Sequence, residues 1–261
     1  MEIDVFYLLR LKDSNYLKRL DNFLLSYLEH KSGTSHCLNI IFKGFSFSRI
    51  NFIKSYIKNN YNVKFNSESQ KDINYDIGSY IVAAKKSKAK YLFFLNSSSL
   101  ILCDNWLKKF HFGYNSTNMG LIGATGSAEK LDHFWFQTWP NYHIRTNAFF
   151  INRELFIKLT ENLGSFVSKD SVWKFESGSN SLTKRVSKMG LDVAVLGRDG
   201  LLYPYYLWQI SNTFKIADQS NLIISDNQTN FYSQASIELK NILANKTWRV
   251  NNAFDFVTNL I

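Results

Sequence analysis

Short apolar segments typical of β-strands alternate with amphipathic segments typical of α-helices between residues 37 and 123 of this 261-residue chain. The apolar runs lie at 37–42, 61–65, 91–95 and 121–123, and helical patterns fill 50–58, 76–86 and 104–110. Strands that pair in parallel need crossover connections between them, which are usually helices. The alternation therefore predicts an α/β fold in which helices cover both faces of a mostly parallel central sheet.

The segments outside this region complete a single predicted domain. Leucines at helical spacing place a helix at 14–29, with Ser14 as its N-cap, so residues 1–35 are expected to form an N-terminal helical extension. Residues 201–226 are aromatic and polar with little periodicity, which indicates an irregular C-terminal tail that folds back as a lid. The other expected elements are a strand at 144–151, a helix at 152–159, a helix at 179–189, a strand at 191–196 and a helix at 233–245.

The composition is that of a folded protein with excess positive charge. Hydrophobic residues make up 45% of the chain and aromatic residues 16%, which is enough to bury a core. Lysine and arginine number 31 against 21 acidic residues, a formal net charge of +10. This excess suits an anionic partner such as a nucleotide diphosphate or a lipid headgroup, and the lysine-rich usage of an AT-rich genome explains it equally well. No zinc ligand set or aromatic RNA-binding motif accompanies the charge, so no nucleic-acid partner is expected.

The cysteines and the first residues bear on cellular location. Cys37 and Cys103 are too few for a disulfide framework, which favours a reducing compartment. The chain begins with acidic residues and has no basic stretch of the kind that opens a secretory signal. The longest apolar runs are far shorter than the roughly 20 residues of a membrane span. We expect a cytoplasmic protein. The alternative is a cytoplasmic protein that binds peripherally to the inner face of the cytoplasmic membrane.

Small polar loops follow three of the predicted strands, at 43–46, 96–99 and 123–127. Ligands of open parallel sheets bind outside the carboxyl ends of the strands. Glycine and serine in these loops allow close approach of a ligand to the backbone, although each loop alone is equally an ordinary turn. Together the loops predict a ligand site at one edge of the sheet.

The order of motifs in this region resembles the nucleotide-sugar half of GT-A glycosyltransferases, most of all glycosyltransferase family 2. The motifs are Asp76-Ile77-Gly78-Ser79-Tyr80, Ala83-Ala84, the run from Tyr91 to Ser99, and Trp106-Leu107. The resemblance covers residues 36–200 and implies a GT-A (Rossmann-like) fold. In its terms, residues 36–130 are the nucleotide-sugar half, residues 131–200 are the acceptor half, and residues 201–261 are the tail and a C-terminal helix.

The second half of the chain continues the resemblance. Residues 143–149 and 153–156 are similar to the acceptor-side strand and helix of these enzymes, and residues 175–178 are similar to their Glu-Asp segment. The whole resembles a bacterial subgroup associated with surface-polysaccharide clusters. The resemblance thus implies transfer of a sugar from a nucleotide-sugar donor to a surface glycan (capsule, O-antigen or lipooligosaccharide), with a glycan or lipid-linked glycan as acceptor.

One departure from the family concerns metal binding. The Asp-x-Asp carboxylates of the family hold a divalent cation on the donor diphosphate, whereas this chain has Asn96 and Ser98 at those positions. Neutral amide and hydroxyl oxygens bind Mg²⁺ or Mn²⁺ weakly, so no metal ligand is predicted and a metal cofactor is doubtful. Three alternatives remain: catalysis without metal, recruitment of another carboxylate such as Asp104, or loss of activity. The last would leave a non-catalytic nucleotide- or glycan-binding module of a polysaccharide assembly system.

Catalysis without metal requires cationic side chains at the leaving diphosphate. Arginine offers a bidentate fork, which favours Arg145 and Arg198 over lysines, with Lys43 as a helper, although each is equally a surface or strand-end charge. The predicted donor-binding residues are Lys43, Asp76, Gly78, Asn96, Ser97, Ser98, Arg145 and Arg198.

Glu176 is the predicted catalytic base, which takes the proton of the acceptor hydroxyl. Its neighbours Phe175 and Gly178 suggest a partly desolvated carboxylate. The alternative is a carboxylate placed just before a helix, where it favours the helix dipole. The predicted acceptor-binding residues are Asp132, His133, Trp139, His143 and Trp208, among which Trp139 precedes a proline and suits a sugar platform.

Overall fold

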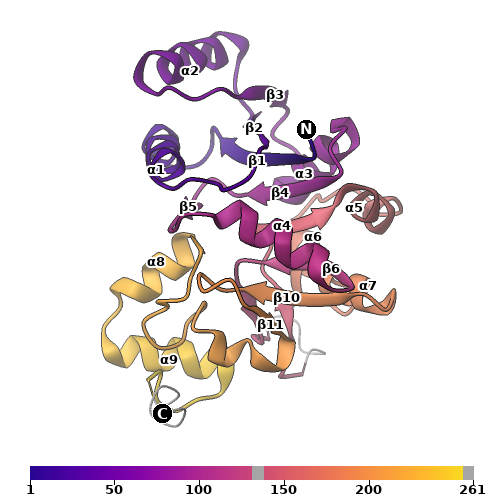
Figure 1. Ribbon diagram of the computed structural model, residues 1–261, viewed down its shortest axis with the longest axis vertical. Helices are drawn as coiled ribbons and strands as arrows, with labels where there is room; N and C mark the ends of the chain where they lie inside the picture. Colours follow the sequence, from indigo (N-terminus) through magenta and orange to yellow (C-terminus); the bar gives the residue numbers. More distant parts are fainter. Residues whose placement is uncertain (131–137, 255–261) are drawn as a thin grey trace.

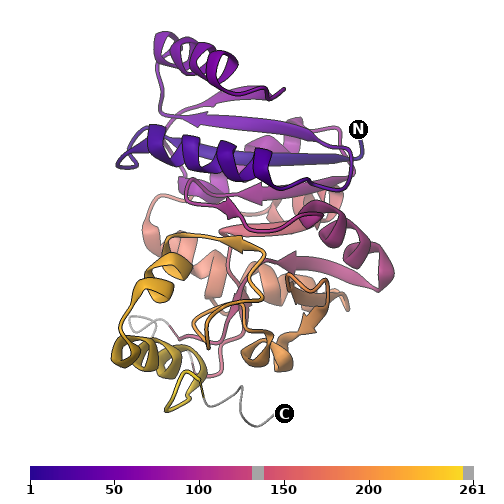
Figure 2. The same cartoon turned by 60° about the vertical axis from the view of Figure 1, so that its left-hand side comes forward.

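The computed structural model describes residues 1–130 and 138–254 and contains an eight-stranded mixed sheet with helices on both faces (Figures 1 and 2). The strand order is β11-β10-β6-β9-β4-β1-β2-β3. The strands are β1 (Ile3–Arg10), β2 (Cys37–Lys43), β3 (Asn66–Gln70), β4 (Tyr91–Leu95), β6 (Met119–Gly123), β9 (Ala148–Asn152), β10 (Asp192–Leu196) and β11 (Leu202–Pro204). The mostly parallel α/β sheet expected from the sequence is confirmed.

Two strands run against the others. β1 pairs in parallel with β2 and β4, β2 with β3, and β6 with β10. β9 lies antiparallel between β4 and β6, and β11 is an antiparallel edge strand beside β10. The carboxyl ends of β1, β2 and β4 therefore meet at one edge of the sheet, next to the start of β9.

The sequence analysis predicted that residues 1–35 form a helical extension outside the sheet, and this prediction is wrong. Residues Ile3–Arg10 form β1, which lies between β2 and β4, and the strand is almost wholly buried. A strand buried on both faces is a nearly continuous apolar run, which suits the segment from Val5 to Leu9. The expected helix is present as α1 (Tyr16–Glu29), although its N-cap is Asn15 rather than Ser14.

The helices form one layer on each side of the sheet. Helices α1, α2 (Phe47–Asn60) and α4 (Trp106–Ser116) cover one face, where Phe23, Ile53 and Phe110 pack in one buried cluster with alternate residues of β1. Helices α3 (Tyr75–Lys86), α5 (Arg153–Thr160), α6 (Lys169–Ser177) and α7 (Leu182–Lys188) contribute to the cluster on the other face. Successive side chains of a strand point to opposite faces of the sheet, so alternate residues of β1 belong to the two clusters.

The predicted strand at 61–65 is displaced along the chain. Residues 61–65 lie outside regular structure, and the strand is β3, whose sequence Asn-Ser-Glu-Ser-Gln is polar and partly exposed. β3 is the edge of the sheet, where polar side chains are tolerated and limit edge-to-edge association.

The tail expected to act as a lid is a packed part of the molecule. It contains β11, two short 3-10 helices (Tyr205–Leu207 and Gln209–Ser211) and β12 (Ile224–Ser225), which pairs with β5 (Leu100–Ile101). Most residues from Thr213 to Asp226 are buried, so the segment forms core rather than a mobile cover. Helices α8 (Asn227–Gln234) and α9 (Ile237–Trp248) follow. No helix in the described parts of the chain is long and apolar enough to span a bilayer.

Candidate functional site

The loop after β4 lies at the centre of the edge where the parallel strands end. The Asn96 side-chain oxygen accepts hydrogen bonds from Ser98 N (3.0 Å) and Ser99 Oγ (3.1 Å), which closes a tight polar turn. The Asn96 N–H donates to the carbonyl of Asn147 (2.9 Å), and the Tyr7 hydroxyl donates to the Ser97 carbonyl (3.0 Å). The predicted residues of this loop are therefore held against β1 and against the segment that leads into β9.

Two side chains from the β1–α1 connection and the first turns of α1 contact this loop. Ser97 Oγ donates a hydrogen bond to the Asp13 carboxylate, and Arg19 Nη1 donates to Ser98 Oγ. Arg19 Nε also donates to the Ser14 carbonyl (3.1 Å). Neither Asp13 nor Arg19 is among the residues predicted from the sequence, because the bonds join positions 84 and 79 residues apart.

Asn96 and Ser98, which stand where the glycosyltransferases that the sequence resembles have Asp-x-Asp, do not fit a divalent cation. The Asn96 oxygen already accepts two hydrogen bonds, and Ser98 Oγ is bonded by a guanidinium. Asp104 is not recruited to this loop, since it is an exposed residue whose carboxylate accepts a hydrogen bond from Lys31 N (2.8 Å). In residues 1–130 and 138–254, no three histidine, cysteine, aspartate or glutamate side chains are grouped to hold a metal.

Glu176 lies in the last turn of α6 and points toward the segment before β9. Its Oε2 accepts hydrogen bonds from the Thr146 N–H (2.7 Å) and from Thr146 Oγ1. The alternative that Glu176 precedes a helix is wrong, because the carboxylate sits at a helix C-terminus, where the dipole disfavours it. Thr146 was not predicted from the sequence, although its neighbour Arg145 was. Glu176 Oε1 has no hydrogen-bond partner in the described part of the chain.

Asp76 and His143 lie in the electrostatic neighbourhood of Glu176. Burial raises the pKa of Asp76, and the carboxylates of Asp13 and Glu176 act in the same direction. Burial lowers the pKa of His143, while the Glu176 carboxylate opposes that change. The charges of Asp13 and Glu176 thus influence Asp76, and the charge of Glu176 influences His143, although no hydrogen bond or ion pair within the described residues joins these four side chains.

Lys43 supports this edge from inside the protein. Its side chain is fully buried, and its ammonium donates to the carbonyls of Ile73 (2.8 Å) and Tyr75 and to Ser79 Oγ (2.9 Å). Burial lowers the pKa of Lys43 to about 8. Because an ammonium has three protons to donate, these bonds use all of them, and Lys43 holds the start of α3 in place.

Gly78 also serves the start of α3. A Cβ at Gly78 would lie 2.2 Å from the Cβ of Asn74, which adopts a left-handed conformation (φ 60°) just before the helix. Glycine therefore permits the close approach of Asn74. Gly78 shapes the turn that carries Asp76.

The two predicted arginines have different surroundings. Arg145 is buried and pairs with Asp226 (2.8 Å), bonds Thr125 Oγ1 (3.3 Å), and lies 4.2 Å from the ring centroid of Phe214. Arg198 is exposed, and its guanidinium bonds the carbonyl of Leu102 (2.9 Å). Within the described ranges of the chain, none of the hydrogen bonds of Arg198 reaches the residues around Glu176.

The predicted acceptor residues that the structure describes differ in exposure and in their hydrogen-bond partners. Trp208 is a core residue with 1% of its surface exposed, and its indole N–H donates to the Tyr203 carbonyl (2.8 Å), so the expectation of an exposed sugar contact is wrong. Trp139 is 37% exposed and donates to the Thr247 carbonyl (3.2 Å). His143 is buried beside Glu176. Asp132 and His133 lie outside the described residues.

A cavity of about 510 Å³ adjoins the end of β1. Its walls include Arg10 and Lys12, the turn before α3 with Asn74 and Tyr75, and the loop after α5. Arg10 and Lys12 both pair with Asp72 (3.3 and 2.8 Å). Burial acts to raise the pKa of Asp72, but these two cations outweigh it and lower the pKa.

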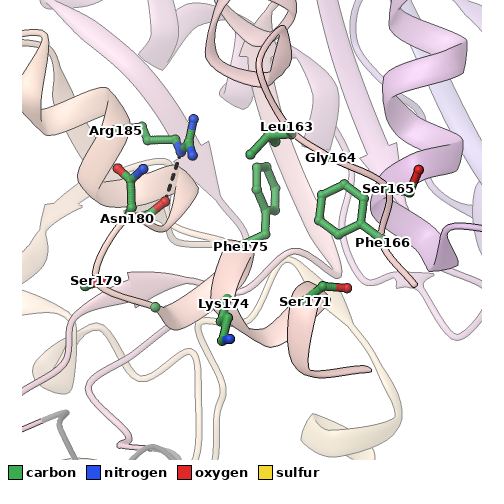
Figure 3. Close-up of a pocket in the computed structure, with 11 residues that line it drawn as sticks. Leu163, Gly164, Ser165, Phe166, Ser171, Lys174, Phe175, Ser179, Asn180 and Arg185 are labelled. Atoms are coloured by element: carbon green, nitrogen blue, oxygen red, sulfur yellow. Dashed lines mark hydrogen bonds between the residues drawn. The ribbon is translucent and has the colours of Figure 1, made fainter. Parts of the chain in front are cut away.

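A second cavity of about 340 Å³ lies between the loop after α5 and helix α6 (Figure 3). The rings of Phe166 and Phe175 meet edge-on there, with centroids 5.6 Å apart. Arg185 Nε bonds the Asn180 carbonyl (2.9 Å) at the far wall, as the dashed line in Figure 3 shows. Phe166 also lines the first cavity, so the loop after α5 forms a wall of both cavities, and Glu176 is not among the residues that line either one.

No protein-family model matches the sequence, and no curated protein matches it. Solved structures are similar in fold. The mannosyltransferase PcManGT from Pyrobaculum calidifontis, solved in complex with GDP-Man and Mn²⁺, has a TM-score of 0.51 at 9% identity over 80% of this chain and 60% of that chain. The 4-diphosphocytidyl-2C-methyl-D-erythritol synthase from Anaerococcus prevotii has a TM-score of 0.48 at 12% identity over 74% and 87% of the two chains. The chain thus spans less than two thirds of the mannosyltransferase, with which it shares a fold.

Proposed function

We propose that this protein is a glycosyltransferase that moves a sugar from a nucleotide-sugar donor to a glycan acceptor. The observation that carries the proposal is the position of Glu176, whose carboxylate is fixed by Thr146 next to the loop after β4. The shared fold with a mannosyltransferase and the motif resemblance support a nucleotide-sugar ligand at this edge. In this proposal, residues 36–130 with β1 bind the donor and residues 131–200 face the acceptor.

The donor would lie along the ends of β1 and β4. The 510 Å³ cavity beside Arg10, Asn74 and Tyr75 has room for a nucleoside, and the loop Asn96–Ser98 would face the diphosphate. Asp76, whose carboxylate lies 3.8 Å from Arg10 Nη1 next to that cavity, would accept a hydrogen bond from a hydroxyl of the donor. Lys43 and Gly78 act by positioning the α3 start, and Arg145 by positioning the segment that carries Thr146.

Glu176 would act as the base of a single displacement. Its Oε1 is free to accept the proton of an acceptor hydroxyl, while Oε2 stays bonded to Thr146. The hydroxyl oxygen forms the new bond to the anomeric carbon as the bond from that carbon to the diphosphate oxygen breaks. The nucleotide diphosphate leaves with the bonding electrons, and the anomeric configuration inverts.

The leaving diphosphate would be stabilised by side chains and amides rather than by a metal held at the loop after β4. Asn96 and Ser98 do not fit a divalent cation, because the Asn96 oxygen accepts two hydrogen bonds and Ser98 Oγ accepts one from the Arg19 guanidinium. The biological acceptor in this proposal is a bacterial surface glycan or its lipid-linked precursor. The reaction would take place in the cytoplasm, and the net charge of +10 would favour contact with an anionic membrane face.

The proposal is tested by sugar transfer in the presence of EDTA. Wild type, Glu176→Gln and the control Glu161→Gln, which changes an exposed glutamate, are incubated with UDP-, GDP-, CMP- and dTDP-sugars and a glycan acceptor panel. Released nucleotide and the mass of the glycan are both measured. We expect one donor class to be consumed, with the Glu176→Gln rate lower by at least about 1,000-fold and donor affinity within about twofold.

Each other outcome has a defined meaning. Full activity of Glu176→Gln removes Glu176 from the mechanism. Donor binding without turnover by wild type supports the non-catalytic module instead. Turnover that stops with EDTA and returns with Mn²⁺ shows that a carboxylate elsewhere holds a metal.

A further inference from the structure

We propose that Arg19 is the cation that binds the donor diphosphate, at the place where related sequences hold a metal. This inference rests on the proposed function, because it assumes that a nucleotide diphosphate occupies the loop after β4. It names a donor-binding residue that lies outside the motifs of the sequence. The argument depends on where Arg19 lies, on which charges surround it, and on what its guanidinium can bind.

Arg19 reaches the loop from a different part of the chain. It lies in the first turns of α1, and its Nη1 donates to Ser98 Oγ, at the second position of the family's Asp-x-Asp motif. The loop itself is rigid, since Asn96 accepts from Ser98 N and Ser99 Oγ. A guanidinium therefore lies where the glycosyltransferases that the sequence resembles have two carboxylates and a cation, and the Asp13 carboxylate lies against the same loop, bonded by Ser97.

Arg19 also differs from the other arginines near this edge, because it has no ion pair in the part of the chain that the structure describes. Arg10 pairs with Asp72 (3.3 Å) and Arg145 pairs with Asp226 (2.8 Å). No ion pair within 4 Å involves Arg19 in residues 1–130 and 138–254. Its remaining bond is to the Ser14 carbonyl, which leaves N–H groups for a ligand.

The chemistry of the guanidinium suits a diphosphate. Its planar fork can donate two parallel hydrogen bonds to phosphate oxygens, which a point charge cannot do. Arg19 is half-buried, so solvent weakens the attraction less than at an open surface. Ser98 would hold the fork in position in the free protein and remain beside the phosphate when the donor binds.

The experiment measures nucleotide binding by calorimetry in EDTA. The probes are UDP, GDP, CDP and dTDP, each beside its nucleoside, and the proteins are wild type, Arg19→Gln and Arg19→Lys. Arg49→Gln is the matched control, because Arg49 is also in the first turn of a helix but is exposed. Thermal unfolding of each variant confirms that it is folded.

We expect wild type to bind one diphosphate without metal. Arg19→Gln should weaken the binding of that diphosphate by about 10- to 100-fold, the range for a lost hydrogen bond to a charged group. The affinity for the nucleoside should not change. Arg19→Lys should recover part of the loss, and Arg49→Gln should match wild type. The nucleoside comparison separates loss of phosphate binding from general damage to the site.

Three results would overturn the inference in different ways. If wild type binds a diphosphate and Arg19→Gln binds it equally well, Arg19 is not the anchor and the proposed function stands. If EDTA abolishes wild-type binding and Mn²⁺ restores it, a metal does the work assigned to Arg19. If wild type binds none of the four diphosphates with or without Mn²⁺, the proposed function fails as well.

Discussion

The backbone N–H of Thr146 donates a 2.7 Å hydrogen bond to the carboxylate of Glu176, and the Thr146 hydroxyl bonds the same oxygen. Thr146, in the segment before β9, thus fixes one oxygen of the Glu176 carboxylate, and the other oxygen has no hydrogen-bond partner among the described residues. A carboxylate at a helix C-terminus has an unfavourable dipole, which these two donors offset. We infer that the pair sets the direction in which Glu176 accepts a proton.

The Thr146 hydroxyl provides a test of this positioning. Thr146→Val keeps the backbone bond and the shape but removes the hydroxyl bond, whereas Thr146→Ser keeps both bonds. We expect Thr146→Val to lower kcat by about tenfold with little change in the donor KM, since one hydrogen bond to a charged group is worth about 1.5 kcal/mol. Thr146→Ser should stay within about twofold of wild type. A donor KM that rises while kcat is unchanged would assign Thr146 to donor binding instead.

The buried ammonium of Lys43 makes a second prediction, on stability. Lys43→Met leaves the carbonyls of Ile73 and Tyr75 and the Ser79 hydroxyl without their donor. We expect the free energy of unfolding at pH 7 to fall by about 2–4 kcal/mol, measured by urea denaturation. A loss of less than about 0.5 kcal/mol would contradict the supporting role of Lys43 at the start of α3.

The lowered pKa of Lys43 predicts how the stability difference between wild type and Lys43→Met changes with pH. Burial lowers the pKa of Lys43 to about 8 in the folded state, below the value of about 10.4 in an unfolded chain. Between these values the unfolded chain binds more protons, so the contribution of Lys43 to stability increases as pH rises from about 8 to 10.4. The stability difference between wild type and Lys43→Met should grow across this window by up to about 3 kcal/mol. A difference that shrinks with pH would contradict the lowered pKa.

The buried pair of Arg145 and Asp226 predicts a large effect of removing one partner. Asp226 also caps α8 by accepting from Gln228 N (3.0 Å) and Thr229 N (2.9 Å). Asp226→Ala removes both roles and should cost about 3–5 kcal/mol in urea denaturation, because it leaves a buried charge unpaired. Asp226→Asn retains an oxygen for the cap and should cost less. Equal losses in the two variants would show that the cap has no separate contribution, and an Asp226→Asn variant as stable as wild type would show that the ion pair with Arg145 contributes nothing.

Much of the fold is predictable from the sequence because its pattern is local. The apolar run that forms β4 and the helices α2 and α3 lie close to their predicted places, and their order is enough for a parallel sheet. β1 was missed although the run from Val5 to Leu9 is apolar and a turn follows it, because residues 1–35 were assigned as a whole to the helical extension predicted from the leucine pattern at 14–29. β3 was displaced because an exposed edge strand has a polar sequence, while the apolar segment before it resembles a strand more closely.

The candidate site is predictable only in part, for the same physical reason. Asn96 and Ser98 follow a recognisable strand pattern, whereas Glu176 was chosen from the motif resemblance and lies in α6, a helix that the sequence analysis did not predict. Arg19 and Thr146 depend on contacts across 79 and 30 residues, which no local pattern contains.

Charge alone also misleads about which cations are free. Lys43 and Arg145 look like ligands for a diphosphate in the sequence, but the fold gives Lys43 three protein acceptors and Arg145 a buried carboxylate. The sequence contains no signal for these partners. Trp208 is a similar case, since an aromatic side chain suits a sugar platform and a core equally well until its burial is seen.

The central claim is that a nucleotide-sugar donor binds at the edge formed by the ends of β1 and β4. A crystal structure with the consumed donor, or with its diphosphate product, measures this most directly. The account predicts that the nucleoside occupies the cavity beside Arg10 and Tyr75, with phosphate oxygens within 3.2 Å of the Arg19 guanidinium and the sugar on the side of Glu176. A nucleotide bound elsewhere, for example in the separate cavity of about 850 Å³ beside Tyr142 and Trp208, would contradict it.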